Sequence, residues 1–189
     1  MSNSVMQAIL DRRSIRAYVQ EAVTEEQKQA LLQAALASPS AINSQPWHFS
    51  FVEDQALLQE VNAALCERLV ANAKDEETRA RFSDPNYSVF YHAPLVVFIS
   101  GPASPEPLKF ATIDAGIAVE NLALAAQGLG LGSVILGMPR EAFLGDKGPA
   151  LEKKLHFPEG YEFKIAISIG KAAATKDAHP IGENKYSFL

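Results

Sequence analysis

The spacing of apolar residues along the chain predicts both helices and strands. Apolar positions recur every three or four residues in four predicted helices: residues 4–11, the segment from Thr24 to about Ala37, the segment after Asp54, and residues 108–131. Short apolar or alternating runs predict strands at residues 49–52, 95–99, 133–137 and 163–170. Residues 139–157 are expected to form short helical pieces, and the charged segment 74–81 a mobile surface cover.

Capping residues mark the starts of two of these helices. Thr24-Glu25-Glu26-Gln27 has the pattern of a capping box, in which the Thr24 and Gln27 side chains each bond to the other residue's backbone. Asp54 can accept hydrogen bonds from the first turn of the helix that follows it. The helix that begins after Thr24 leads directly into a polar stretch.

That stretch, residues 38–49, is the segment around which the chain is organised, and we call it the shelf loop. It reads Ser-Pro-Ser-Ala-Ile-Asn-Ser-Gln-Pro-Trp-His-Phe and combines turn formers, hydrogen-bonding side chains and aromatic rings. One interpretation is a ligand shelf anchored by Trp47. The other is a tight connector in which Pro39 and Pro46 only set turns. The loop by itself fits both.

A second polar segment follows the first predicted helix. Arg12, Arg13, Ser14 and Arg16 place three guanidinium groups and one hydroxyl within five residues. Guanidinium groups bind phosphate oxygens through paired hydrogen bonds, so this run could hold a phosphate and a second electron-rich group. Alternatively, it is a solvated basic patch that stabilises the carboxyl end of the helix.

The predicted helix at 108–131 is apolar on most of its faces. Asp114 and Glu120 are the only ionised side chains between Ala111 and Leu131. Such a helix is too polar to span a bilayer and must be covered on nearly all sides. We expect a second subunit to contribute to that cover.

The composition is that of an ordinary globular protein, and it limits the kinds of partner that the protein is expected to bind. Hydrophobic residues make up 48% and charged residues 21% of the 189 residues, which suits a single domain over residues 1–189. A net charge of −5 offers no basic surface to nucleic acid. No segment reaches the roughly 18 uncharged apolar residues of a membrane span. The sequence shows no signal-peptide pattern, and its one cysteine, Cys66, is expected to pack as a small apolar residue. Both features predict a cytoplasmic protein.

Several common functional motifs are not found in the sequence. Gly128, Gly130 and Gly132 are spaced as G-x-G-x-G and follow a helix, so they lack the strand-to-helix turn that binds a dinucleotide. There is no phosphate-binding P-loop and no G-x-S-x-G nucleophile motif. The four histidines are not spaced as metal ligands.

Four segments, in order along the whole chain, together resemble the FMN-dependent nitroreductase family. They are residues 11–18 (DRRSIRAY), the shelf loop with its SQPWHF end, residues 114–122 (DAGIAVENL), and residues 130–137 followed by Ile169-Gly170. The resemblance implies an α+β fold with a mostly antiparallel central sheet surrounded by helices. It also implies a homodimer in which the long central helix forms much of the interface and two FMN sites lie at the subunit boundary.

The family pattern also implies a cofactor contact for each matching position. Arg12, Arg13 and Ser14 would bind the FMN phosphate and ribityl chain, and Arg16 would lie at the pyrimidine edge of the isoalloxazine ring. Backbone N–H groups near flavin N5 and O4 would come from Leu136 and Gly137. The other subunit would supply a set of residues packed against the ring: Pro39, Ser40, Ala41, Ile42 and Asn43.

The activity implied by the resemblance is a ping-pong reduction. NADH or NADPH would reduce FMN and leave, and a small acceptor such as a nitroaromatic or a quinone would then take two electrons. Negative charge develops near N1 and O2 of the reduced flavin, so a cation at Arg16 would stabilise it. No catalytic side chain is assigned, because the cofactor carries the chemistry. Two alternatives are a flavin-binding protein without turnover and a specialised relative that modifies its flavin or dehalogenates an aromatic.

One expected contact of this family is not fixed by the sequence. Many relatives complete the phosphate site with a basic residue near the carboxyl end, and the position that aligns here holds Ile181. The candidates for this role in the chain are Lys171, Lys176, His179 and Lys185.

Overall fold

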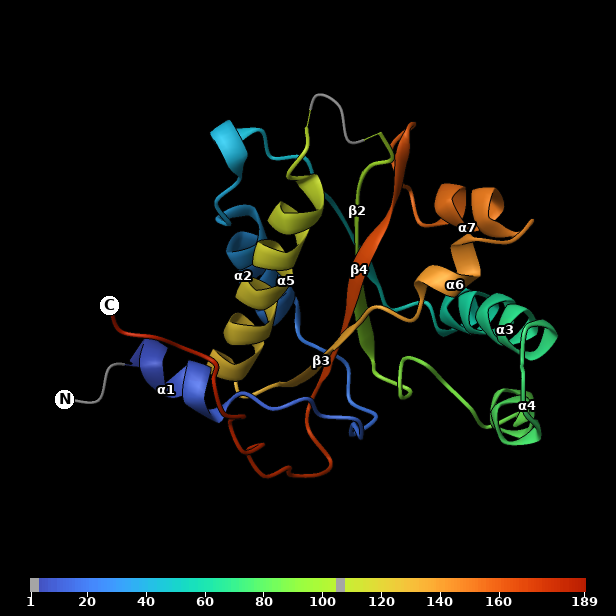
Figure 1. Ribbon diagram of the computed structural model, residues 1–189, viewed down its shortest axis with the longest axis horizontal. Coiled ribbons are helices and arrows are strands. Elements are labelled where there is room, and N and C mark those ends of the chain that lie inside the picture. Colours follow the sequence, from blue (N-terminus) through green and yellow to red (C-terminus); the bar gives the residue numbers. More distant parts are fainter. Residues whose placement is uncertain (1–3, 105–107) are drawn as a thin grey trace.

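The computed structural model describes residues 4–104 and 108–189, in which an antiparallel sheet has helices on both faces (Figure 1). The strand order is β1-β2-β4-β3, and each neighbouring pair is antiparallel. The strands are β1 (His48–Val52), β2 (Leu95–Pro102), β3 (Gly132–Leu136) and β4 (Tyr161–Gly170). The α+β fold with a mostly antiparallel sheet is therefore confirmed.

The helices divide into two groups, one on each face of the sheet. One group contains α2 and α5, and the other contains α3, α6 and α7 (Figure 1). The helices are α1 (Ser4–Asp11), α2 (Glu25–Leu36), α3 (Gln55–Ala71), α4 (Glu76–Ser83), α5 (Ala111–Gly128), α6 (Arg140–Phe143) and α7 (Gly148–Lys154), with a short 3-10 turn, η1 (Ala41–Asn43), in the shelf loop.

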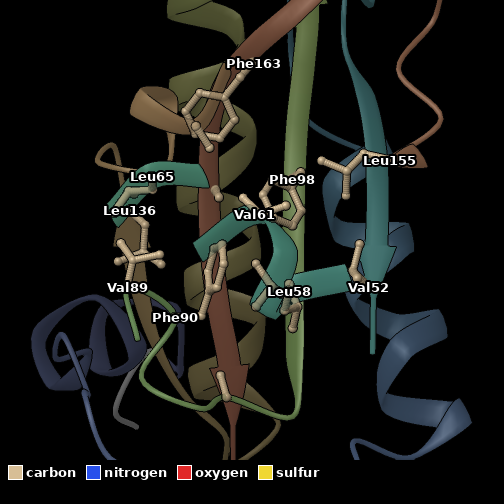
Figure 2. Packing of buried hydrophobic residues seen from close by; sticks show 14 of the residues in the cluster. Val52, Leu58, Val61, Leu65, Val89, Phe90, Phe98, Leu136, Leu155 and Phe163 are labelled. Atoms are coloured by element: carbon tan, nitrogen blue, oxygen red, sulfur yellow. The ribbon is translucent and has the colours of Figure 1, made fainter. Parts of the chain in front are cut away.

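Residues 95–99 of strand β2 are all apolar and fully buried, because both faces of the sheet are covered there. Val97 and Ile99 point into the core beneath α2 and α5, whereas Val96 and Phe98 point into the core beneath α3. Figure 2 shows Phe98 among the side chains of the second core, which include Val61 from α3. The sheet is thus a rigid layer held between two apolar cores.

Two predicted segments differ from the structure. The charged segment 74–81 was predicted as a mobile cover, but most of it belongs to helix α4, where the Asp75 side chain caps the helix by accepting from the Thr78 backbone at 2.7 Å. The sequence did not predict this helix, because a single buried residue, Phe82, leaves no helical repeat of apolar positions to detect. Helix α5 is shorter than the predicted 108–131, and it ends just before Gly130, which adopts a positive φ of 72°.

The chain beyond β4 first follows the sheet and then becomes extended and exposed. Tyr18 and Ala172 form an isolated antiparallel bridge, after which no helix or strand is formed in residues 174–189. Over the parts of the chain that the structure describes, none of the helices combines the length and the apolar character needed to cross a membrane.

Candidate functional site

Residues 12–18, which we call the basic segment, are fixed to the edge of the sheet by backbone bonds. Ser14 forms a parallel bridge with Ser133, and the Ile15 backbone N–H donates to the Ser133 carbonyl at 2.9 Å. The buried Tyr18 hydroxyl donates to the Ile15 carbonyl at 2.8 Å. The segment therefore behaves as a partial extra strand beside β3.

The guanidinium groups of this segment make different contacts. Arg13 Nη1 donates to the carbonyls of Leu10 at 2.6 Å and of Arg12 at 2.8 Å. Arg13 therefore caps the carboxyl end of α1, as expected if the basic run stabilises that helix end. Arg12 Nε lies 3.3 Å from Glu120 Oε1. Arg16 is exposed, and its guanidinium carbon lies 5.8 Å from the centre of the Tyr91 ring.

Two N–H donors in the basic segment are buried without a hydrogen bond. The Nε atoms of Arg12 and Arg13 have no hydrogen-bond partner within residues 4–104 and 108–189, since the contact of Arg12 with Glu120 lacks the alignment of a hydrogen bond. Buried polar groups normally find partners. Arg12 Nε thus faces the Glu120 carboxylate, whereas Arg13 Nε is left without a partner among the described residues.

The shelf loop has an unusual backbone conformation. Ile42, Asn43 and Gln45 have positive φ angles of 50°, 56° and 46°. Such angles are rare outside glycine, above all for a β-branched residue such as Ile42, which is 93% exposed. Trp47 is buried and lies 6.0 Å from the Phe49 ring, so it anchors the end of the loop as the ligand-shelf interpretation requires.

The basic segment and the shelf loop lie at opposite ends of α5 (Figure 1). Ala41 contacts Asp114 in the first turn of α5, whereas Arg13 lines a hollow with Gln127 from its last turn. Asp114 and Gln127 are 13 residues apart, or about 20 Å along the helix, and Arg12 contacts Glu120 between them. Within one chain, the sequence-predicted residues 12–16 therefore do not meet residues 39–43.

Leu136 and Gly137 lie on the same side of the molecule as the basic segment. Leu136 ends β3, three residues after the Ser133 bridge, and Gly137 begins the turn into α6. Beside this turn, the Tyr87 hydroxyl donates to Met138 Sδ at 3.4 Å. The structure thus places Ser14 beside β3 at Ser133, three residues before Leu136 and four before Gly137.

The structure also bears on the candidates near the carboxyl end. Lys176 lines the same hollow as Arg13, which has a volume of about 290 Å³. Lys171 instead pairs with Glu21 at 3.0 Å. Lys176 was one of four candidates in the sequence, and its position beside Arg13 could not be read from residue spacing.

The described part of the chain contains one cysteine, Cys66, and no cluster of metal-ligating side chains. Cys66 is half-buried against the core, and burial raises the pKa of its thiol, which disfavours a reactive thiolate. Within the described ranges, no three His, Cys, Asp or Glu side chains are grouped as metal ligands. Tyr18, Asp114 and Asn121 lie in segments that carry the family resemblance, but residue spacing alone indicates no role for them.

The sheet with helices on both faces and the basic segment on its edge point to one protein family. Comparison of the sequence with known families identifies the same one. Residues 9–171 match the profile of the nitroreductase family. The chain belongs to this family.

Individual relatives resemble the chain over most or all of their length. A protein of Archaeoglobus fulgidus, provisionally named an NADH dehydrogenase/NAD(P)H nitroreductase, is 33% identical over 174 residues, which are 91% of this chain and 87% of that protein. The crystal structure of a nitroreductase with bound FMN from Desulfitobacterium hafniense DCB-2 has 31% identity and a TM-score of 0.90, with both chains fully covered. A nitroreductase with bound FMN from Bacteroides fragilis NCTC 9343 has 26% identity and a TM-score of 0.89, also with both chains fully covered.

Proposed function

We propose that this protein is an FMN-dependent oxidoreductase that uses NADH or NADPH to reduce small acceptors such as nitroaromatics or quinones. Its membership of the nitroreductase family supports this function, as do two relatives solved with FMN and one named for a nicotinamide donor. The observation that carries the proposal is the basic segment, a cluster of guanidinium donors bridged to the edge of the sheet, in which Arg13 Nε is buried without a hydrogen bond.

The donors of the basic segment fit a phosphorylated flavin. Arg12, Arg13 and Ser14 would hold the phosphate and ribityl chain, and Lys176 is the basic residue from the carboxyl end that is placed to join Arg13. When bound, FMN supplies the electron transfer between donor and acceptor.

Other residues would orient the ring of the flavin. The exposed guanidinium of Arg16 would lie at the pyrimidine edge, where a cation stabilises the reduced anion. Backbone groups of Leu136 and Gly137 would orient the ring from the end of β3. The chain itself contributes binding, orientation and charge, and no catalytic side chain is required.

A homodimer would complete this site. In one chain the shelf loop is bound to the first turn of α5, whereas Arg12 contacts Glu120 near the middle of that helix and Arg13 lies beside its last turn. We therefore assign Pro39, Ser40, Ala41, Ile42 and Asn43 to the flavin of a second copy. The surface also favours a dimer, because large apolar side chains on α1, on α5 and just before α5 are exposed. They are Val5, Met6, Ile9, Leu10, Phe110, Ile113 and Ile117.

We also propose one FMN-binding domain over residues 1–189 in a cytoplasmic protein that binds neither nucleic acid nor membrane. The net charge of −5 and the single cysteine support these statements.

The first test is the visible spectrum of the purified protein, followed by anaerobic titration with NADH and with NADPH. We expect flavin absorbance that one or both donors bleach, and that a nitroaromatic or quinone restores. A protein that stays colourless after incubation with FMN would refute the proposal. Flavin that is bound but never reduced by either donor would instead support the non-turnover alternative.

A variant then tests the role of Arg16. Arg16→Ala should weaken FMN binding and lower the two-electron potential of the flavin, because it removes the cation at the pyrimidine edge. If both quantities equal those of the wild type, Arg16 does not contact the pyrimidine edge.

A further inference from the structure

We propose that Asp114 and Asn121 are positioning residues, which hold the shelf loop in the conformation that receives the flavin of the other subunit. This inference rests on the proposed function and gives a role to the DAGIAVENL segment of α5. It concerns how the shelf is built, and neither side chain is proposed to touch the cofactor.

Asp114 and Asn121 fasten two points of the loop to one helix. The Ala41 backbone N–H donates to Asp114 Oδ1 at 3.1 Å, and Asn121 Nδ2 donates to Ser38 Oγ at 2.9 Å. Seven residues separate Asp114 from Asn121, which is about two turns, so both side chains leave the same side of α5. The loop is therefore held at its start and at the first residue of η1.

The loop needs such anchors because its backbone is strained. Ile42, Asn43 and Gln45 all adopt left-handed angles, and this conformation persists only where the surroundings enforce it. Bonds inside the loop help, since the Gln45 backbone donates to Ser40 Oγ at 2.9 Å. Local bonds of this kind do not connect the loop to the scaffold, whereas those from α5 do.

The burial of Asp114 is energetically unfavourable. It is only 3% exposed, and among the described residues its Oδ2 atom has no hydrogen-bond partner. A buried and half-paired carboxylate destabilises the fold relative to an apolar side chain of similar size. Its contribution therefore lies in the bond to Ala41, which places the turn carrying Ile42 and Asn43.

A preformed shelf strengthens cofactor binding because less chain has to be ordered when the flavin arrives. Without the Asp114 anchor, the strained residues would relax toward ordinary angles and the shelf would be populated only part of the time. The apparent FMN affinity should then equal the affinity of the preformed shelf multiplied by the fraction of chains that hold the shelf conformation.

The test compares three variants of the full-length protein by FMN titration. Loss of a hydrogen bond to a charged group predicts about a tenfold to hundredfold weaker affinity for Asp114→Ala. Asp114→Asn keeps an acceptor oxygen and should recover most of this loss. Asp54→Ala is the matched control, because Asp54 also accepts backbone N–H bonds, from Ala56 and Leu57, but caps α3. The control should lower thermal stability and leave FMN affinity unchanged.

The only tryptophan of the chain supplies a readout that needs no flavin. Trp47 lies in the shelf loop and is buried. In FMN-free protein, Asp114→Ala should make Trp47 fluorescence more accessible to acrylamide, and Asp54→Ala should not. If the wild type fails to bind FMN, the proposed function fails. If the wild type binds FMN but Asp114→Ala has wild-type affinity and wild-type quenching, the positioning role is refuted.

A mixed dimer shows on which flavin Asp114 acts. One subunit carries Arg16→Ala and the other carries Asp114→Ala, with different affinity tags so that the mixed dimer is purified alone. If the loop serves the flavin of the other subunit, both substitutions damage the same site, and one site of wild-type affinity remains. Two weakened sites would overturn the inference that Asp114 acts across the interface.

Discussion

Replacing Tyr18 by phenylalanine tests how the basic segment is held in place. The Tyr18 hydroxyl donates to the Ile15 carbonyl at 2.8 Å and lies 3.3 Å from the Ser168 carbonyl, and the side chain is buried. Phenylalanine keeps the ring, so no cavity forms and only the hydroxyl is lost. A buried hydrogen bond whose acceptor is left unpaired is worth about 1–2 kcal/mol. For a chain of this length, Tyr18→Phe should lower the melting temperature by roughly 2–8 °C.

The same substitution should change how stability depends on pH. Burial raises the pKa of the Tyr18 phenol above its usual value of about 10. The folded protein therefore keeps the Tyr18 proton at a pH where the unfolded chain releases it, and stability falls as the pH rises above 10. At pH 11 this costs the wild type about 1.4 kcal/mol. Tyr18→Phe has no such group, so its disadvantage at pH 8 should shrink to roughly zero at pH 11.

Urea unfolding at pH 8 and at pH 11 measures both effects. Wild type and Tyr18→Phe are compared at one protein concentration, because the stability of a dimer depends on concentration. The other tyrosines and lysines titrate in both proteins and cancel in the difference. A stability difference that is the same at both pH values would show that the Tyr18 hydroxyl is not buried in the folded protein.

Three other substitutions test separate parts of the structure. Glu120→Gln removes the carboxylate 3.3 Å from Arg12, so FMN should bind more tightly while the affinity for riboflavin, which has no phosphate, changes little. Equal changes in affinity for both ligands would argue against a phosphate at Arg12. Thr24→Ala removes the capping box of α2 and should cost about 1 kcal/mol in urea unfolding without altering FMN affinity. Phe98→Ala empties a fully buried position, where the Phe98 ring lies 5.6 Å from that of Phe90. It should lower the free energy of unfolding by about 3–5 kcal/mol, and a variant of near wild-type stability would contradict this.

Much of the fold could be predicted because its strands and helices are strongly patterned. The run Leu95–Ile99 was predicted as a buried strand, and it is the inner strand β2. Thr24 and Asp54 were predicted to cap helices, and both do so. These features depend on neighbouring residues alone, so periodicity and capping chemistry were enough to find them.

The arrangement of the site could not be predicted in the same way. The pairing of Ser14 with Ser133 joins residues far apart in sequence, and no periodic pattern encodes it. The Arg12 contact with Glu120 and the Ala41 bond to Asp114 are likewise long-range. The residue types of the site were visible in the sequence, whereas the separation of its two parts along α5 required the structure.

The two parts of the proposed site are held by different kinds of bond, and this predicts how each can fail. The basic segment is fixed by backbone bonds to the sheet and, on the side-chain level, by the Tyr18 hydroxyl, so substitutions at its arginines leave these bonds in place. The shelf loop is fixed to α5 through the side chains of Asp114 and Asn121, so single substitutions can release it. Helix α5 also exposes Ile113 and Ile117 on the proposed dimer surface. Because one helix carries both the loop anchors and this surface, separating the subunits should release FMN even from chains whose sequence is intact.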